Sequence, residues 1–255
     1  MSNTTQMSGK VVLVTGSATG LGLSTARAFG LAGATVAITD LELASARGAA
    51  DTLVAEGIDA HAFALDVRRE AHWPRVLRQL ERRCGGLDVL VNNAGVGRSA
   101  PLVETSLADW RFVTQVNLDG VFLGIKFGIG AISQHGGGAI VNVASILGTV
   151  GTLNNAAYVA AKGGVRQLSK AAALECAAAG NGIRVNCVLP GYVEMPRAPA
   201  KRMSAERRKQ LLAATPMARF ATPAEIADAI VYLASPQASY ITGTDLIVDG
   251  GFTAL

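Results

Sequence analysis

A tyrosine and a lysine four residues apart are the side chains of this sequence best suited to acid–base chemistry. Tyr158 and Lys162 would share one face of a helix. No Asp, Glu, Lys or Arg occurs from Phe127 to Ala161, so Lys162 ends a long uncharged run. A nearby cation lowers the pKa of a phenol by about 1–3 units. The pair therefore predicts a phenolate base that takes a proton from an alcohol. A half-buried tyrosine beside a solvated lysine is the alternative interpretation.

A glycine-rich turn directly follows the first apolar run of the chain. The segment from Thr15 to Gly22 has glycines at positions 16, 20 and 22. Such a turn lets the backbone approach a pyrophosphate, whose charge binds to free amides at the start of a helix. The turn predicts a dinucleotide cofactor bound by Gly16, Thr19, Gly20, Leu21 and Gly22. A tight connection that binds no ligand is the alternative.

An acidic residue ends the second apolar run, at the spacing expected for a ribose contact. Asp40 would hold the adenine ribose hydroxyls and would repel a 2′-phosphate. The next residue is Leu41 rather than an arginine that would welcome such a phosphate. The combination predicts NAD rather than NADP as the cofactor. Capping of a helix that begins near Leu41 is the other interpretation of Asp40.

Short apolar runs alternate with longer helical patterns along the chain. Strands are predicted at residues 10–15, 35–39, 60–64, 87–91, 139–143, 183–188 and 245–248. Helices are predicted at residues 21–33, 41–56, 70–83, 107–127, 156–179 and 223–233, the last starting at the capping box Thr222–Glu225. Continuous apolar strands between helices are typical of a parallel sheet covered on both faces. We therefore expect one doubly wound α/β domain over residues 1–255.

Composition and charge exclude several other classes of protein. Half of the residues are hydrophobic, and the net charge of +4 comes from scattered basic residues, so we expect no nucleic-acid partner. The polar N-terminal segment lacks a signal-like apolar region, and glycines 136–138 interrupt the uncharged run, so we expect neither secretion nor a membrane span. The cysteines lack metal-type spacing and predict reduced thiols in a cytoplasmic protein without a bound metal; they are Cys84, Cys176 and Cys187.

Taken together, the motifs resemble those of the short-chain dehydrogenase/reductase family, over residues from about Gly9 to Phe252. In the family's order they are the turn Thr15–Gly22, Asn92-Asn93-Ala94-Gly95, Asn117, Ser145, Tyr158-x-x-x-Lys162 and Pro190-Gly191. The resemblance implies a seven-stranded Rossmann sheet in the order 3-2-1-4-5-6-7, with a cofactor crevice at the carboxyl ends of the strands. It also implies a nicotinamide-dependent oxidoreductase that assembles as a homotetramer.

The resemblance implies further site residues. Asn117 would hold a water that connects Lys162 to solvent, and Lys162 would also hold the nicotinamide ribose. Asp66 and Val67 would contact adenine. Close approach of the cofactor would involve Asn93, Ala94 and Gly95, and its nicotinamide end would meet Pro190, Gly191 and Val193. Met195 stands where many relatives have a threonine that helps to hold the carboxamide.

Three of these candidates also have plain structural interpretations. Ser145 ends a strand, where its hydroxyl could donate to the substrate oxygen, but serine is also a common turn former. Asn117 falls within a predicted helix and could instead bond to neighbouring backbone. Asp66 could cap the helix that follows it.

The expected substrate pocket is mainly apolar. Its candidate residues are Ile146, Leu147, Leu153, Tyr192 and Met195, with the segment 196–212 inside a substrate loop and helix at about 195–215. We therefore expect an NAD-dependent enzyme that interconverts a secondary alcohol and a ketone, on an uncharged, cyclic or steroid-like substrate. The alternative enzyme is a 3-oxoacyl thioester reductase, whose acidic carrier would meet the basic residues Arg197, Lys201, Arg202, Arg207, Arg208 and Lys209. An NAD-sensing or scaffold protein is the alternative without catalysis.

Overall fold

Seven parallel strands form one sheet in the computed structural model, which describes residues 6–194 and 203–254. They are β1 (Val11–Thr15), β2 (Thr35–Asp40), β3 (Ala60–Ala64), β4 (Val89–Asn92), β5 (Gly138–Val143), β6 (Ile183–Pro190) and β7 (Asp245–Val248). Their order in the sheet is β3-β2-β1-β4-β5-β6-β7, and every pairing is parallel. The chain reverses its winding between β1 and β4, which is where an open α/β sheet binds its ligand. The predicted strand order is confirmed.

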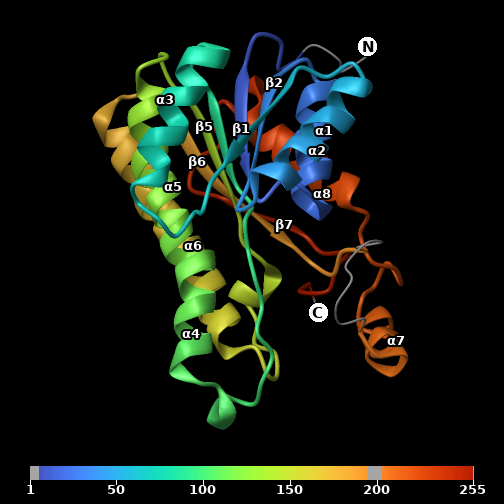
Figure 1. Cartoon of the computed structure of the whole chain (residues 1–255). Coiled ribbons are helices and arrows are strands. Elements are labelled where there is room, and N and C mark those ends of the chain that lie inside the picture. Colours follow the sequence, from blue (N-terminus) through green and yellow to red (C-terminus); the bar gives the residue numbers. More distant parts are fainter. Residues whose placement is uncertain (1–5, 195–202, 255) are drawn as a thin grey trace.

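Two layers of helices cover the sheet (Figure 1). One face is covered by α1 (Gly20–Leu31), α2 (Leu43–Ala55) and α8 (Pro223–Ala234), and the other by α3 (His72–Cys84), α5 (Gly120–Ser133) and α6 (Ala156–Ala179). Successive residues of β1 alternate between these layers: Val12 and Val14 pack on the first side, and Leu13 packs on the second. This alternation of fully buried residues explains why the strands read as continuous apolar runs. The predicted α/β fold class is confirmed.

The helix predicted at 107–127 is divided into three parts. It consists of α4 (Leu107–Thr114), a π-helical turn η2 (Gln115–Asp119) and α5. Within the π turn, Asn117 Nδ2 donates a hydrogen bond of 2.9 Å to Val113 O, four residues earlier. Widened turns of this kind are frequently found at functional sites. The sequence shows only a helical period here, so the widened turn was not predicted.

Shorter elements complete the fold. The helix α7 (Ala205–Ala213) lies within the segment expected to carry a substrate loop and helix. Three single 3-10 turns, η1 (Leu102–Glu104), η3 (Ile146–Gly148) and η4 (Pro236–Ala238), connect the larger elements. The predicted role of Met195, and those of Arg197, Lys201 and Arg202, lie outside the described residues.

One helical stretch resembles a membrane span in length and composition. It runs over Leu107–Ser133, and half of its most apolar window is buried inside the fold. Its α5 portion packs on the sheet, with Val121 and Ile132 in the hydrophobic core. The uncharged run from Phe127 to Ala161 comprises the end of α5, β5, η3 and the start of α6. Leu107–Ser133 is accordingly a core element of the domain, and the uncharged run is divided among several elements, as its interrupting glycines indicated.

Candidate active site

A cavity of about 790 Å³ opens at the carboxyl ends of the strands. Most of the residues proposed from the sequence line it, and they come from every part of the chain. They are Gly16, Thr19, Gly20, Leu21, Gly22, Asp40, Asp66, Val67, Asn93, Ala94, Gly95, Ser145, Tyr158, Lys162, Pro190, Gly191 and Val193. The cavity therefore contains both the glycine turn and the tyrosine–lysine pair.

The glycine turn has the geometry of an anion cradle. Gly16 and Gly20 have φ angles of +60° and +58°, a left-handed conformation that side chains rarely adopt. Thr19 is the N-cap of α1, but its side chain makes no capping hydrogen bond, and the first turn of α1 carries no acidic residue. The amides at this helix start therefore lack a capping side chain, and their residues line the cavity. They provide donors and a positive dipole end for a pyrophosphate.

The Asn93 loop packs directly against this turn. Asn93 Nδ2 donates to the backbone oxygens of Thr15 at 2.8 Å and Gly16 at 3.1 Å. A Cβ on Gly16 would lie 3.0 Å from Ala94 Cα. The loop thus fixes the path of the turn, and small residues on both sides keep the crevice open to a ligand.

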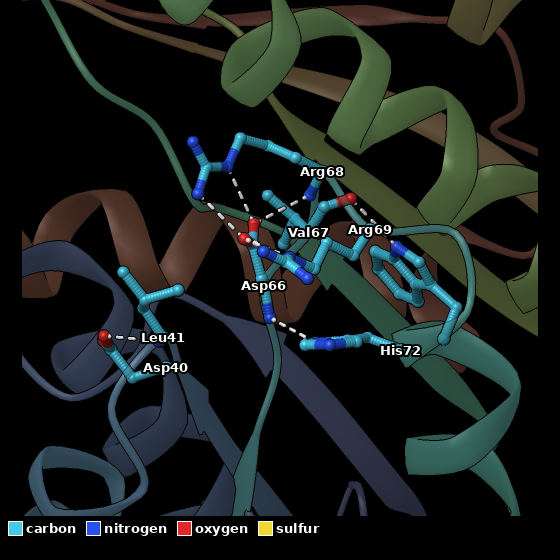
Figure 2. A network of polar contacts seen from close by, with 8 residues as sticks. Asp40, Leu41, Asp66, Val67, Arg68, Arg69 and His72 are labelled. Atoms are coloured by element: carbon cyan, nitrogen blue, oxygen red, sulfur yellow. Dashed lines mark hydrogen bonds and ion pairs between the residues drawn. The ribbon is translucent and has the colours of Figure 1, made fainter.

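Two carboxylates also line the cavity, near the ends of β2 and β3 (Figure 2). Asp40 accepts a hydrogen bond from the Leu41 amide at 2.8 Å. It does not cap α2, which begins at Leu43 after the N-cap Glu42. Asp66 accepts from the Arg68 amide at 3.1 Å and from the Arg68 guanidinium, and the N-cap of α3 is Ala71. The helix-capping interpretation of both carboxylates is therefore wrong.

The proposed acid–base residue stands at the inner end of the cavity. Tyr158 lies in the first turn of α6, and Ser145 lies at the end of β5, immediately before η3. Burial raises the pKa of the Tyr158 phenol, and a hydrogen bond with Ser145 partly counteracts this rise in pKa. Ser145 Oγ also accepts from the Leu147 amide at 3.1 Å, so it shapes the turn as well as facing the phenol. Ser145 can therefore both form the turn and act as a hydrogen-bond partner at the site.

Lys162 is almost entirely buried, with 3% of its surface exposed. Its ammonium lies 5.6 Å from the centre of the Tyr158 ring and donates a hydrogen bond of 2.7 Å to Val143 O. Burial lowers the pKa of Lys162 to about 8. The pKa of Tyr158 is thus raised, which is opposite to the decrease predicted from the lysine four residues later. Loss of water around the phenol outweighs the effect of its neighbours on the tyrosine pKa.

Asn117 lies behind the lysine, in the π turn η2, and is fully buried. Its Nδ2 donates to Val96 O at 2.8 Å and Val113 O at 2.9 Å, and its Oδ1 accepts from the Val96 amide at 3.3 Å. The side chain is thus bonded to backbone, which is the structural interpretation of this residue. A Cβ on Gly95 would lie 2.8 Å from Asn117 Oδ1 and 3.8 Å from Lys162 Nζ, so the asparagine and the lysine flank one glycine.

An aromatic cluster supports the last wall of the cavity. The Tyr192 ring lies 5.7 Å from the Phe220 ring and 5.5 Å from the Phe252 ring. The Gly191 amide donates to Val248 O at 2.9 Å, and Val193 forms a bridge with Ala221. These contacts fix the segment from Pro190 to Val193, which lines the same cavity as Tyr158.

One pocket residue was predicted wrongly, and several lining residues were missed. Leu153 is 84% exposed and does not line the cavity, because it belongs to the surface loop before α6. Ile146, Leu147 and Tyr192 do line it. Arg68 and Phe112 also line it and were not predicted. An arginine two residues after Asp66 was a usable signal, whereas the position of Phe112 depends on how α4 packs.

Comparison with known proteins identifies the family. A family model described as enoyl-(acyl carrier protein) reductase matches residues 16–253. The chain is 43% identical to cis-4-hydroxycyclohexanecarboxylate dehydrogenase of Sinomonas cyclohexanicum, over 96% of this chain and 97% of that protein. It is 39% identical to the NADP-dependent (R)-specific alcohol dehydrogenase of Lentilactobacillus kefiri, over 98% and 99% of the two chains.

Two further similarities agree with these. The chain is 38% identical to cyclohexanol dehydrogenase of Acinetobacter sp. strain SE19, over 100% of this chain and 98% of that protein. A crystal structure from Sinorhizobium meliloti 1021, described as a short-chain alcohol dehydrogenase, superimposes with a TM-score of 0.92 at 34% identity, over 97% of each chain. The same sheet, the same motif order and these full-length similarities place the chain in the short-chain dehydrogenase/reductase family, as an oxidoreductase.

Proposed function

We propose that the protein transfers hydride between NAD(H) and an uncharged cyclic secondary alcohol or its ketone. The observation that carries this proposal is one cavity that joins the glycine turn and Asp40 to Ser145, Tyr158 and Lys162. A nicotinamide ring bound at the inner end would accept a hydride from the alcohol carbon. Three relatives are named as alcohol dehydrogenases or dehydrogenases of a hydroxylated ring, which supports the reaction class.

In this proposal Tyr158 exchanges the proton of the reacting oxygen. During oxidation its phenolate takes the hydroxyl proton as the carbinol C–H bond breaks, and during reduction its phenol returns the proton. Ser145 donates a hydrogen bond to the same oxygen and stabilises the charge that develops there. Lys162 holds the ribose hydroxyls next to the ring. Asn117 keeps the π turn and the backbone of Val96 in place behind the lysine.

The choice of NAD depends on the ribose end of the cavity. Asp40 lines the cavity with Leu41 beside it, and no cation of the described chain forms an ion pair with this carboxylate. A 2′-phosphate there would meet an uncompensated negative charge. One relative is NADP-dependent, so the cofactor is a property to be measured on this chain.

The wall around Tyr158 favours an uncharged ring as substrate. Ile146, Leu147 and Tyr192 supply apolar surface, and the described cations that line the cavity are Arg68, at the adenine end, and Lys162. A carboxylated ring, such as the one in the name of the Sinomonas enzyme, would find no free cation there among the described residues. Cyclohexanol and cyclopentanol are therefore better test substrates than 4-hydroxycyclohexanecarboxylate.

The acyl-thioester alternative has weaker support. The matching family model is described as an enoyl-(acyl carrier protein) reductase. However, Arg208 forms an ion pair of 2.8 Å with Glu194 and lies 4.6 Å from the Phe220 ring centre. This arginine is therefore bound within the chain instead of being free for an acidic carrier. A purely NAD-sensing role is disfavoured because Tyr158 and Lys162 are both present in the cavity.

A cytoplasmic homotetramer completes the proposal. All three cysteines are free, which suits a reducing compartment. The exposed apolar side chains Leu107 and Phe122 lie on α4 and α5, where a second copy could cover them. Light scattering of the purified protein tests the tetramer.

The test of the function is absorbance of reduced nicotinamide during turnover. The purified protein is assayed with NAD and NADP on cyclic alcohols, linear alcohols and 3-oxoacyl thioesters, with Tyr158→Phe as the control. We expect NAD reduction on cyclic alcohols that the variant loses. Turnover of thioesters alone, or activity unchanged in Tyr158→Phe, would refute the proposal.

A further inference from the structure

Arg68 holds the Asp66 carboxylate in a fixed orientation within the cavity. Its Nε donates to Asp66 Oδ1 at 2.8 Å, and its terminal nitrogen donates to Oδ2 at 2.8 Å. The Arg68 amide adds a bond of 3.1 Å to Oδ1. Figure 2 shows this two-pronged contact, opposite Asp40 and Leu41. Both Asp66 and Arg68 line the same cavity as the glycine turn.

The Asp66 carboxylate has a limited number of acceptor positions, and the contact with Arg68 determines which of them are occupied. An ionised carboxylate offers about two lone-pair positions on each oxygen. Both positions on Oδ1 are used, by the amide and Nε of Arg68, whereas Oδ2 accepts a single close donor. The next nearest cation, Arg69, lies at 3.5 Å from Oδ2 with a side chain that is 70% exposed. The second acceptor position on Oδ2 therefore meets only this longer contact with exposed Arg69, and it is the position left for another donor.

The backbone around Asp66 is held as firmly as its side chain. The Asp66 amide donates to His72 Nδ1 at 3.3 Å, and Trp73 Nε1 donates to Val67 O at 3.1 Å. The hydrogen bond from Arg68 is the main cause that keeps the pKa of Asp66 below its usual value. The carboxylate thus stays ionised, and only its direction is left for a neighbouring side chain to determine.

We propose that Arg68 is a positioning residue that makes the site select adenine by its exocyclic amino group. The inference rests on the proposed function, in which a dinucleotide lies along this cavity. With Asp66 clamped, its free Oδ2 position accepts from the adenine amino group. Hypoxanthine presents a carbonyl oxygen at the same place, and that oxygen would face a carboxylate without a proton between them. Arg68 therefore determines base selectivity without touching the reacting atoms.

The test is direct binding of two dinucleotides that differ in this one group. Titration calorimetry compares NAD with nicotinamide hypoxanthine dinucleotide on wild type, Arg68→Ala and Arg69→Ala. A hydrogen bond to a charged group is worth about tenfold to a hundredfold in affinity, so wild type should prefer NAD by that factor. In Arg68→Ala the preference should fall to about threefold or less, because a mobile carboxylate loses most of that bond.

Arg69→Ala is the matched control. It removes a neighbouring arginine that also lies near Asp66 but does not line the cavity. We expect it to keep the wild-type preference for adenine, and thermal unfolding shows whether each variant is folded. An equal loss of preference in both variants, or an unchanged preference in Arg68→Ala, overturns the role of Arg68.

A second arm separates this inference from the proposed function. NADP and its hypoxanthine counterpart differ in the same base as the NAD pair does. The ratio of their affinities can therefore be measured even if the protein prefers NADP. If the protein binds NADP instead of NAD, and its preference for adenine depends on Arg68, the inference is supported and the NAD proposal is rejected. If neither dinucleotide binds wild type, both are rejected.

Discussion

Replacing Gly22 by alanine should disable the cofactor turn through a steric conflict between backbone segments. A Cβ at this position would overlap Gly16 O, and it would lie 2.6 Å from Asn93 Nδ2 and 2.8 Å from Ser17 Cα. Two of these three neighbours are backbone atoms of the turn itself. Because they cannot rotate away as a flexible side chain would, α1 and the turn must move apart.

The cost follows from the size of the overlap. An added methyl in a close-packed site costs about 1–3 kcal/mol of folding free energy. For a chain of this length, 1 kcal/mol corresponds to a shift of about 2–4 °C in Tm. We therefore expect Tm to fall by roughly 2–12 °C. The affinity for NAD should fall by more than about tenfold, which is a loss of 1.4 kcal/mol, because the amides of the helix start no longer converge.

Gly48 provides the matched control, since it is also a glycine within a helix. It lies in α2, and a Cβ there would meet no atom within 4 Å. Gly48→Ala should stabilise the protein by about 0.5–1 kcal/mol through helix propensity and leave NAD binding unchanged. Thermal unfolding and NAD titration of both variants make the comparison. A Gly22→Ala protein with wild-type Tm and affinity would refute the argument, as would equal destabilisation by Gly48→Ala.

Three further predictions concern charges in the site. Since burial raises the pKa of Tyr158, alcohol oxidation should accelerate by up to about tenfold per pH unit above neutrality, and Tyr158→Phe should lose about a hundredfold or more, as a pH–rate profile would show. The pKa of Lys162 falls to about 8, below its unfolded value, so the folded state binds this proton more weakly. Between pH 7 and pH 10, the free energy of unfolding of wild type should therefore rise by roughly 2–3 kcal/mol relative to that of Lys162→Met, as denaturant unfolding would show. A difference between the two proteins that does not change with pH would contradict this. Asp40→Ser should improve the NADP to NAD ratio of kcat/KM by at least about tenfold, since a repulsive charge is removed, and an unchanged ratio would count against the ribose contact.

The sequence predicted the sheet well because its signals are local. The central strands are short apolar runs buried on both sides, and the edge strands β3 and β7 have the predicted bounds although they are only partly buried. The capping box at Thr222 is formed, with Glu225 accepting from the Thr222 amide at 2.8 Å, so α8 starts at the predicted proline. Boundaries without such a signal shifted by one or two residues, as for α2, whose start at Leu43 carries no side-chain cap.

The errors concern features that local sequence patterns do not specify. The Asn117 side chain in the π turn makes three hydrogen bonds to backbone, and two of them are to Val96, which lies on a different segment. The direction of the Tyr158 pKa depends on how much water the folded walls exclude, which spacing cannot express. Arg68 was visible as a residue, but its pairing with Asp66 needed the turn after β3. Leu153 looked like pocket lining by its type, yet the loop directs it outward.

The uncharged run before Lys162 now has a physical reason. Its segments form β5, η3 and the first turn of α6, which together enclose Ser145 and Tyr158. A carboxylate in these walls would pair with Lys162 and remove its ammonium from the ribose side of the cavity. Within the described chain the ammonium instead donates to the neutral oxygen of Val143. Burial favours the neutral forms of both Tyr158 and Lys162, because it raises the pKa of the phenol and lowers the pKa of the amine. A phenol that keeps its proton can donate it to a forming alkoxide, so we expect ketone reduction near neutral pH and faster alcohol oxidation as the pH rises; an oxidation rate that does not change with pH would contradict this.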